Sequence, residues 1–373
     1  MRVGSRWVAS ALVLWAGIVV PAGATEDSGE FEIRTVKPLD AAQLSKLRAL
    51  AASDPEAGAL AREAAAAAEP LLGAEPRPLA VIHYEGLVNT DPRRIATVAQ
   101  LREMDSVAAL VRYWQSSGDA RAAATLRRFI VAWASVYEPT GNDVNENKLY
   151  PLLVSYHALR GTFDPDARQR VDRWLESLGS RHARAVQEST HFTNRYTKHV
   201  RLLAVIGRIL DRPAWRAAAA GGITRFVDHA LRADGTSLDL ERRDTLTYHA
   251  SALRPIIELA MLAGPDGAAL YRWEAPGGGS VKKSVDYVVP YALGEKTREE
   301  WRNSTVALDH KRAAAGLEHY RTGRLYDPAS ALGLMEDASY FDPSLLRVVL
   351  HLTRSNARRF PTWQSLVNEA CRE

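Results

Sequence analysis

A phenol and three nitrogen-bearing side chains lie close together in the stretch ERRDTLTYH (241–249). A tyrosine hydroxyl has an ordinary pKa of about 10, and nearby positive charge favours its ionised form. Arg242, Arg243 and His249 are the local sources of such charge for Tyr248. An ionised phenol can remove a weakly acidic proton and then return it as an acid, so the pattern indicates acid–base chemistry.

The same residues also have a purely structural interpretation. Both arginines would then pair with neighbouring acidic residues at the surface, and the Tyr248 hydroxyl would point into water. Asp234-Gly235 marks a turn, and we expect the next helix to begin near Asp244. That start places Tyr248 about one turn inside the helix.

A second polar group leads into an apolar helix in STHFTNRYTKHVRLLAVIGRIL (189–210). A helix that begins near Asn194 puts Lys198 one turn from Asn194 and His199 one turn from Arg195. Polar groups at the start of an inner helix would point toward the mouth of a helical ring. Alternatively, Asn194 only caps the helix and His199 is a hydrogen-bonded interior histidine.

The elements that must position these residues are helices. Apolar residues recur every three or four positions from about residue 41 to 263, and short Gly, Pro, Asp and Asn breaks separate the periodic segments. Helices joined by short turns lie antiparallel to their neighbours. We therefore expect an all-α fold, an α/α toroid formed as an incomplete barrel of antiparallel helical hairpins. In WEAPGGGSVKKSVDY (273–287) we expect a loop over the mouth of the toroid, with helices resuming near Glu295, and the alternative is a flexible surface connection.

The first 24 residues have the features of a secretory signal peptide. Arg2 and Arg6 precede an apolar run, and Ala22-Gly23-Ala24 forms a small-residue cleavage site. The run is short for a membrane span, so we expect a periplasmic or secreted protein with no stable membrane span after cleavage. Residues 25–373 would form a single toroid domain. Cys371 is the only cysteine, so the hydrophobic core must hold the fold without disulfides.

The charge balance argues against nucleic acid as a partner. The net charge is +4, and it falls to +2 when the two arginines of residues 1–24 are removed, leaving 46 basic against 44 acidic residues. Nucleic-acid binders usually carry a larger or more concentrated basic excess. The sequence has no HExxH, no CxxC pair and no EF-hand loop, so we expect neither a metal nor a cofactor.

Four segments together resemble the alginate lyase family of bacterial polysaccharide lyases. The first is Asn194 through His199 together with VRLLAVIG, which follows it. The others are DGTSLDLERRDTLTYH (234–249), EPTGNDVNENKL (138–149) and VDYVVPYALGEK (285–296). The similarity runs with gaps from about His83 to Asp342. The resemblance implies an α/α toroid that cleaves uronic-acid polymers by β-elimination. It also implies a catalytic set of an asparagine and a histidine on one helix and an arginine and a tyrosine on a later one, which match Asn194, His199, Arg243 and Tyr248.

One departure bears on the substrate. In the best-known alginate lyases the histidine directly follows the asparagine, whereas Arg195 occupies that place here and the nearest downstream histidine is His199. This difference is more typical of a divergent branch, such as the glucuronan-type lyases. The expected partner is an anionic uronate-containing polysaccharide. The candidates are alginate or polymannuronate, and alternatively glucuronan.

Elimination beside a carboxylate requires that the carboxylate be neutralised, because negative charge builds up there as the proton leaves. Asn194, Arg243 and His199 can supply the donors, and Tyr248 can act as base and then as acid. A histidine base with Tyr248 as the acid remains an open alternative. Further residues are predicted to bind the sugar chain: Arg242, His249, Asn145, Lys148, Arg195, Tyr196, His83, Tyr84, Lys282 and Lys283.

Two other functions fit the same helical pattern. A glycoside hydrolase on a similar toroid would use two carboxylates, for which Glu146 and Asp239 are the candidates. A periplasmic helical scaffold would bind an exopolysaccharide without turnover. A new C4=C5 double bond in the product distinguishes a lyase from the hydrolase and from the scaffold.

Overall fold

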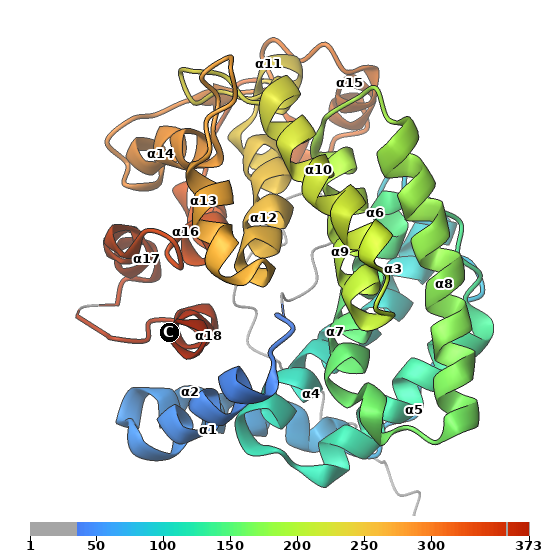
Figure 1. Cartoon of the computed structure of the whole chain (residues 1–373). Coiled ribbons are helices and arrows are strands. Elements are labelled where there is room, and N and C mark those ends of the chain that lie inside the picture. Colours follow the sequence, from blue (N-terminus) through green and yellow to red (C-terminus); the bar gives the residue numbers. More distant parts are fainter. Residues whose placement is uncertain (1–35, 356, 373) are drawn as a thin grey trace, which may run out of the picture.

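The chain folds into an α/α toroid, as the helical periodicity predicts. The computed structural model describes residues 36–355 and 357–372, so the predicted signal peptide lies outside the described residues. The helices follow one another around a ring of antiparallel pairs, and the C-terminal helix returns to the side of the first ones (Figure 1).

The first half of the ring contains α1 (Ala41–Ser53), α2 (Pro55–Ala68), α3 (Pro92–Leu101), α4 (Glu103–Ser117), α5 (Ala120–Val136), α6 (Asp143–Glu146), α7 (Tyr150–Leu159), α8 (Pro165–Glu188) and α9 (Asn194–Ile209). The second half contains α10 (Pro213–Ala230), α11 (Leu238–Arg243), α12 (Leu246–Leu262), α13 (Gly267–Arg272), α14 (Val281–Ala292), α15 (Ala307–Ala314), α16 (Leu332–Ala338), α17 (Leu346–Thr353) and α18 (Trp363–Cys371). Two short strands, β1 (Glu299–Glu300) and β2 (Arg324–Leu325), pair antiparallel. Short 3-10 helices are η1 (Glu69–Leu71), η2 (Asn147–Leu149), η3 (Arg160–Thr162), η4 (Gly264–Asp266), η5 (Glu318–Tyr320), η6 (Pro328–Ala331) and η7 (Pro343–Leu345).

Helix α9 is the central helix of the ring and is apolar on two sides. Its Leu202, Val205 and Ile206 belong to the hydrophobic core of the first half. Val200 and Leu203 belong to the core of the second half. Because both sides of α9 are buried, most of its polar residues lie in the first two turns, and Arg208 is exposed in the last turn.

The N- and C-terminal parts of the described chain pack together and complete the ring. Leu47 of α1 and Leu366 of α18 belong to one small apolar cluster. The ammonium of Lys37 lies 3.1 Å from Glu258 on α12 and 2.9 Å from Asp337 on α16, and all three side chains are buried. The segment before α1 is therefore fixed to the second half of the toroid by an interior ion-pair network.

Two helix boundaries differ from the prediction. The expected loop over 273–287 ends at Ser280, whose side chain accepts from the Lys283 amide and caps α14, so helices resume at Val281 and not near Glu295. The helix expected to begin near Asp244 begins at Leu246. Asp244 instead ends α11 in a left-handed conformation with a φ of 55°, which makes Arg242 and Arg243 the last turn of α11.

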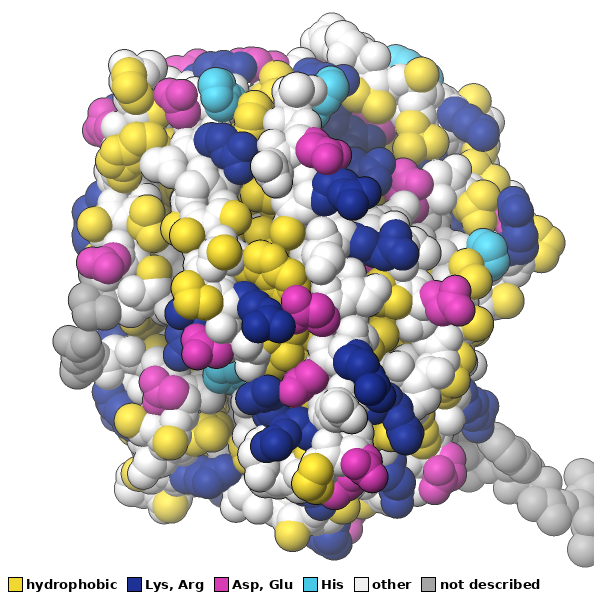
Figure 2. Space-filling view, turned by 45° about the vertical axis from the view of Figure 1, so that its right-hand side comes forward, with side chains coloured by type: hydrophobic (Ala, Val, Ile, Leu, Met, Phe, Trp, Pro, Cys, Tyr) yellow, Lys and Arg dark blue, Asp and Glu magenta, His cyan; other side chains and the backbone are white. Residues whose placement is uncertain are grey.

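Charges of both signs are interspersed on the face seen in Figure 2, where Lys and Arg side chains alternate with Asp and Glu. None of the helices in the described ranges is both long enough and apolar enough to cross a membrane.

Candidate active site

Tyr248 lies in the first turn of α12, and a carboxylate from a distant strand fixes that turn. Glu300 of β1 accepts from the Thr245 hydroxyl at 2.9 Å and from the Leu246 amide at 2.7 Å. Amide groups at a helix N-terminus have no partner inside the helix, and an anion there is also favoured by the helix dipole. Glu300 therefore holds the start of α12, and with it Tyr248, in place.

The Tyr248 hydroxyl lies in a buried polar cluster formed by residues that follow β1. The Arg312 guanidinium donates to the Tyr248 oxygen at 3.2 Å and to the Tyr320 oxygen at 2.6 Å. The two hydroxyl oxygens are 3.1 Å apart and share a hydrogen bond. Both tyrosines are nearly fully buried, with exposed fractions of 3% and 1%. An ionised Tyr248 would thus have a cationic donor and a second phenol as partners.

A second cation covers the ring of the same tyrosine. The guanidinium carbon of Arg243 lies 3.5 Å from the Tyr248 ring centroid. Asp309 of α15 fixes this arginine by two hydrogen bonds, one of them from Nε at 3.0 Å. The pKa of Arg243 is raised, because burial disfavours its charged form but the charges of Tyr248 and Asp309 outweigh that effect. Trp301 packs edge-on against Tyr248 and completes the enclosure.

The two predicted segments meet at the carboxyl group of Asp239 on α11. The backbone amide of Asn194, at the start of α9, donates to Asp239 at 2.7 Å. Burial raises the pKa of Asp239 to about 7, although the Asn194 amide and the charges of Arg243, Lys198 and Arg242 act in the opposite direction. Asn194 and the two arginines are therefore neighbours of one buried carboxyl group, and Arg243 links that group to Tyr248.

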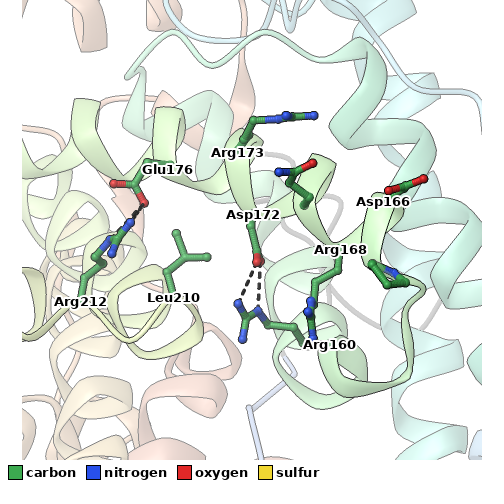
Figure 3. Close-up of a pocket in the computed structure, with 10 residues that line it drawn as sticks. Arg160, Asp166, Arg168, Asp172, Arg173, Glu176, Leu210 and Arg212 are labelled. Atoms are coloured by element: carbon green, nitrogen blue, oxygen red, sulfur yellow. Dashed lines mark hydrogen bonds and ion pairs between the residues drawn. The ribbon is translucent and has the colours of Figure 1, made fainter.

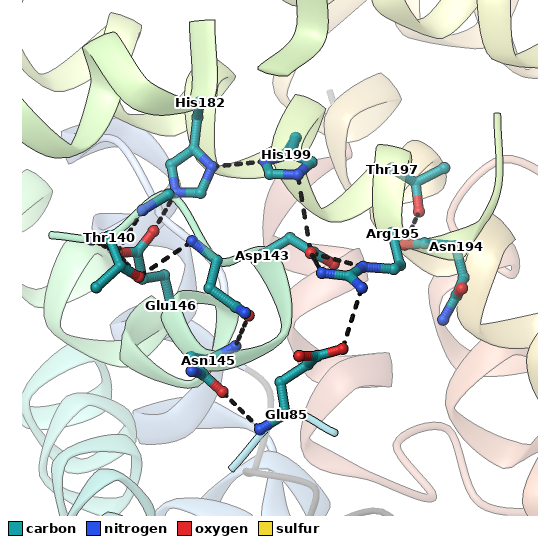
Figure 4. Close-up of polar contacts among 12 residues, drawn as sticks. Glu85, Thr140, Asp143, Asn145, Glu146, His182, Asn194, Arg195, Thr197 and His199 are labelled. Carbon is teal, nitrogen blue, oxygen red and sulfur yellow. Dashed lines mark hydrogen bonds and ion pairs between the residues drawn. The ribbon is translucent and has the colours of Figure 1, made fainter. Parts of the chain in front are cut away.

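His199 lies on the adjacent side of α9 in a different set of contacts, drawn in Figure 4. Its Nδ1 is 2.8 Å from Nδ1 of His182 on α8, and His182 Nε2 is 3.0 Å from Glu146. Burial lowers the pKa of His199 to about 4, so its ring is neutral near pH 7. Its side chain keeps 15% exposure, whereas His182 and Glu146 are fully buried.

Arg195 shares the His199 side of α9, as their one-turn spacing predicts. Its guanidinium donates twice to Asp143 of α6, at 2.9 and 2.7 Å, and once to Glu85 at 3.1 Å. Half of its side chain is exposed. Arg195 thus stands at the edge of the site with its charge already matched by two carboxylates.

The sequence of residues 45–298 matches the family model described as alginate lyase, which is more than half of the chain. The chain belongs to the alginate lyase family. It is therefore a polysaccharide lyase. The match ends before Trp301, Arg312 and Tyr320, which contact Tyr248, and before Asp309, which holds Arg243.

Solved structures of this family share the fold. Alginate lyase A1-III from Sphingomonas species A1 superposes with a TM-score of 0.59 at 16% identity, over 80% of this chain and 87% of that chain. A histidine-to-alanine variant of A1-III complexed with tetrasaccharide gives a TM-score of 0.52 at 15% identity, over 72% and 76% of the chains. A tyrosine-to-phenylalanine variant complexed with tetrasaccharide gives 0.51 at 16% identity, over 70% and 80%. Among curated proteins, no sequence matches.

Four further residues predicted to bind the sugar chain gather in the first half of this lyase. Asn145 accepts from the Glu85 amide at 2.9 Å and donates to the Ile82 carbonyl at 2.9 Å, so it anchors the segment between them. The ammonium of Lys148 lies 4.9 Å from the Tyr84 ring centroid. His83 of this segment is exposed, whereas Tyr84 is buried. The Asn145 side chain thus has a structural role as well as a place near Arg195.

Other predicted binding residues of the lyase have interior or local partners. His249 is fully buried, with Nδ1 2.7 Å from the Ser237 hydroxyl and Nε2 2.9 Å from the Ser284 carbonyl. Both of its nitrogens are thus used by the protein, and burial lowers its pKa to about 4, so we leave it out of the proposed site. Tyr196 is buried among apolar residues of the second-half core.

Lys282 and Lys283 lie on α14 and not in a glycine-rich loop over the mouth. Lys282 pairs with Asp286 at 2.6 Å, and Lys283 pairs with Glu274 at 2.8 Å. Their charges are matched locally, so we leave both lysines out of the proposed site as well.

Lys198 was not among the predicted site residues, although its one-turn spacing from Asn194 is visible in the sequence. Its side chain is only 7% exposed. Within the described part of the chain its ammonium has no hydrogen bond or ion pair, and its charge acts on Asp239. Charged groups with little exposure are normally paired, so the Lys198 ammonium is open to an anionic ligand.

The carboxylates considered for a hydrolase are both committed to protein groups. One oxygen of Glu146 accepts from the Tyr137 hydroxyl and from the amides of Thr140 and Gly141, and the other faces His182. Asp239 is buried against the Asn194 amide. Neither carboxylate is open to a glycosidic oxygen.

A separate depression of about 900 Å³ lies beside α8 (Figure 3) and contains none of the predicted site residues. Two of its arginines are paired with acids in the same depression, Arg160 with Asp172 and Arg212 with Glu176. This depression therefore lies apart from the candidate site at Tyr248 and the start of α9.

Proposed function

We propose that this lyase cleaves alginate-type uronate polymers by β-elimination, with Tyr248 as the base and then the acid. The observation that carries the proposal is the placing of two guanidinium groups on one phenol, Arg312 at its oxygen and Arg243 over its ring. Positive charge at these positions stabilises the phenolate and so makes a base of a group that is otherwise protonated near pH 7.

The reaction conserves every proton and electron pair. The Tyr248 phenolate takes the proton from C5 of the uronate, the C–H electrons form the C4=C5 double bond, and the C4–O4 bond breaks. The O4 oxygen leaves with that electron pair and takes the proton from Tyr248, which regenerates the phenolate. Tyr320 supports both states, because its hydroxyl can donate to the phenolate or accept from the phenol.

Neutralisation of the sugar carboxylate falls to groups at the start of α9. Lys198 offers the ammonium of a largely buried side chain, Asn194 offers its side-chain amide, and His199 offers the N–H of a neutral ring. These donors stabilise the negative charge that builds up on the carboxylate as the C5 proton leaves. Arg243 adds positive charge between this group and Tyr248.

The test is a product assay with purified protein. We expect new ultraviolet absorbance from the C4=C5 bond on alginate and polymannuronate, with polyguluronate, glucuronan and hyaluronan as comparison substrates. A rise on glucuronan alone would keep the elimination and change the polymer. Absence of a rise on all five polymers would refute the proposed function.

We also propose that the protein acts outside the cytoplasm, after removal of residues 1–24. The support is the pattern of two arginines, an apolar run and a small-residue site in the sequence. Fractionation of expressing cells, with determination of the mature N-terminus, tests it. A cytoplasmic protein that begins at Met1 would contradict it.

A further inference from the structure

Three side chains form a continuous buried contact chain behind the active site: Glu146, His182 and His199 (Figure 4). Glu146 lies 3.0 Å from His182 Nε2, and His182 Nδ1 lies 2.8 Å from His199 Nδ1. The far nitrogen of His199, Nε2, lies 3.8 Å from an oxygen of Asp143. The charged groups that face the two rings are Glu146 and Asp143 from α6 and Arg195 from α9.

Glu146 at one end of the contact chain and Asp143 at the other determine which ring nitrogens of His182 and His199 carry hydrogens. Burial opposes the ionisation of Glu146, but the Tyr137 hydroxyl and the amides of Thr140 and Gly141 donate to one of its oxygens and favour the carboxylate, and its pKa is lowered. An ionised carboxylate only accepts, so Nε2 of His182 must carry a hydrogen. At the other end, a lone pair on Nε2 of His199 would face the anionic oxygen of Asp143. The favourable arrangement is therefore a hydrogen on His199 Nε2.

The proton on the central hydrogen bond follows from these two ends. His199 is neutral, so it carries one hydrogen, and if that is on Nε2 its Nδ1 can only accept. The hydrogen between the two Nδ1 atoms then belongs to His182. This arrangement satisfies both contacts of His182 when each of its nitrogens carries a hydrogen.

We propose that His182 is a buried imidazolium paired with Glu146, and that the two act as positioning residues that hold His199 as a neutral Nε2–H donor for the uronate carboxylate. The role of His199 toward the sugar rests on the proposed function, whereas the protonation of the pair does not. The pairing also explains how a fully buried histidine can be charged, since the charge of Glu146 neutralises it locally.

The geometry leaves the His199 donor available to a ligand. A separation of 3.8 Å is too long for a hydrogen bond, and Asp143 is already bound twice by Arg195. The His199 side chain has 15% exposure. A carboxylate that enters the site can therefore accept a hydrogen bond from Nε2–H without displacing a protein partner. The imidazolium behind it strengthens this donor through the shared hydrogen bond.

Nitrogen NMR of ¹⁵N-histidine-labelled protein, without substrate, tests the protonation directly. We expect both His182 nitrogens to be protonated and His199 to be protonated at Nε2 only. Signals are assigned by their loss in His182→Asn and His199→Asn variants. A neutral His182, or a His199 protonated at Nδ1, would overturn the proposal, and this readout is independent of any lyase activity.

Two matched variants test the positioning role. His182→Asn places an amide nitrogen near the position of Nδ1 and keeps a donor to His199, whereas His182→Gln places it near Nε2 and keeps only the contact to Glu146. We expect His182→Asn to retain most of the kcat/KM and to keep the Nε2–H form of His199. We expect His182→Gln to lose about tenfold in kcat/KM, the usual effect of losing one hydrogen bond that serves a charged group. Equal kcat/KM in the two variants would contradict the positioning role, whereas an inactive wild-type protein would instead refute the proposed function.

Discussion

Arg243 stands with its guanidinium carbon 3.5 Å from the ring centroid of Tyr248, and Asp309 holds it there. A cation over the face of a phenol is attracted by the ring electrons and favours the phenolate. Arg312 approaches the same phenol from the oxygen side. Two cations on one buried tyrosine would be a costly arrangement in a merely structural core, and they make Tyr248 the focus of the predictions below.

Replacing the Tyr248 hydroxyl should abolish turnover without unfolding the protein. We expect Tyr248→Phe to lower kcat by about 100-fold or more, because the base and the acid are lost together. Ultraviolet assay of the unsaturated product measures the loss, and circular dichroism verifies the fold. Tyr271→Phe is the matched control, since that buried hydroxyl has no hydrogen-bond partner in the described part of the chain and lies on α13. Full activity of Tyr248→Phe would remove Tyr248 from the mechanism.

Removing the cation at the phenol oxygen should change the pH dependence of the reaction. We expect Arg312→Met to move the acidic limb of the pH profile of kcat/KM to higher pH, because the phenolate then forms only at lower proton concentration. Arg321→Met, which removes an exposed arginine of a surface ion pair, is the control. An unchanged acidic limb in Arg312→Met would show that Arg312 does not stabilise the ionised base.

Replacing Lys198 should weaken substrate binding and at the same time stabilise the folded protein. We expect Lys198→Met to raise KM by about tenfold, with weaker inhibition by salt, because a cation that binds the sugar carboxylate is lost. The same change should raise the free energy of unfolding by about 1 kcal/mol, since a largely buried lysine whose charge has no partner is replaced by an apolar side chain of similar size. Urea denaturation measures the second effect. Lys311→Met, at an exposed position of α15, is the control, and a destabilised Lys198→Met protein with unchanged KM would assign Lys198 a structural role.

Asp239 should make the protein less stable as the pH rises. Its folded pKa is about 7, above the ordinary value of 3.8, so the folded state holds the proton more tightly than the unfolded chain does. The stability that this group contributes is full below about pH 4, falls as the pH rises to 7, and stays low above it. We expect Asp239→Asn to gain stability relative to wild type between pH 4 and pH 8, by a few kcal/mol at most (about 1.4 kcal/mol per pH unit). Urea denaturation at the two pH values measures the difference, and a constant difference would contradict the raised pKa.

Helical spacing was sufficient to predict the arrangement on α9. Residues one turn apart share a side of a helix, which correctly pairs Arg195 with His199 and Asn194 with Lys198. The same geometry explains why His249 differs from the expectation. Consecutive residues on a helix point about 100° apart, so His249 cannot share the direction of Tyr248 and instead faces Ser237 and Ser284.

The environment of the Tyr248 hydroxyl could not be predicted in this way. Arg312 on α15 and Tyr320 on η5 lie more than 60 residues further along the chain, on short elements that no periodic pattern in the sequence marks. Their position follows from the pairing of β1 with β2 and from Glu300 at the start of α12, which are tertiary contacts. His182 was missed for a similar reason, because only the packing of α8 on α9 brings it to His199.

Helix α9 contributes Leu202 and Ile206 to one apolar core and Val200 and Leu203 to the other. Neither half of the ring can lose its packing while this shared helix remains in place for the other half. Heating should therefore melt the toroid in one calorimetric transition, and we expect the candidate site groups on α9 to stay in place until that transition.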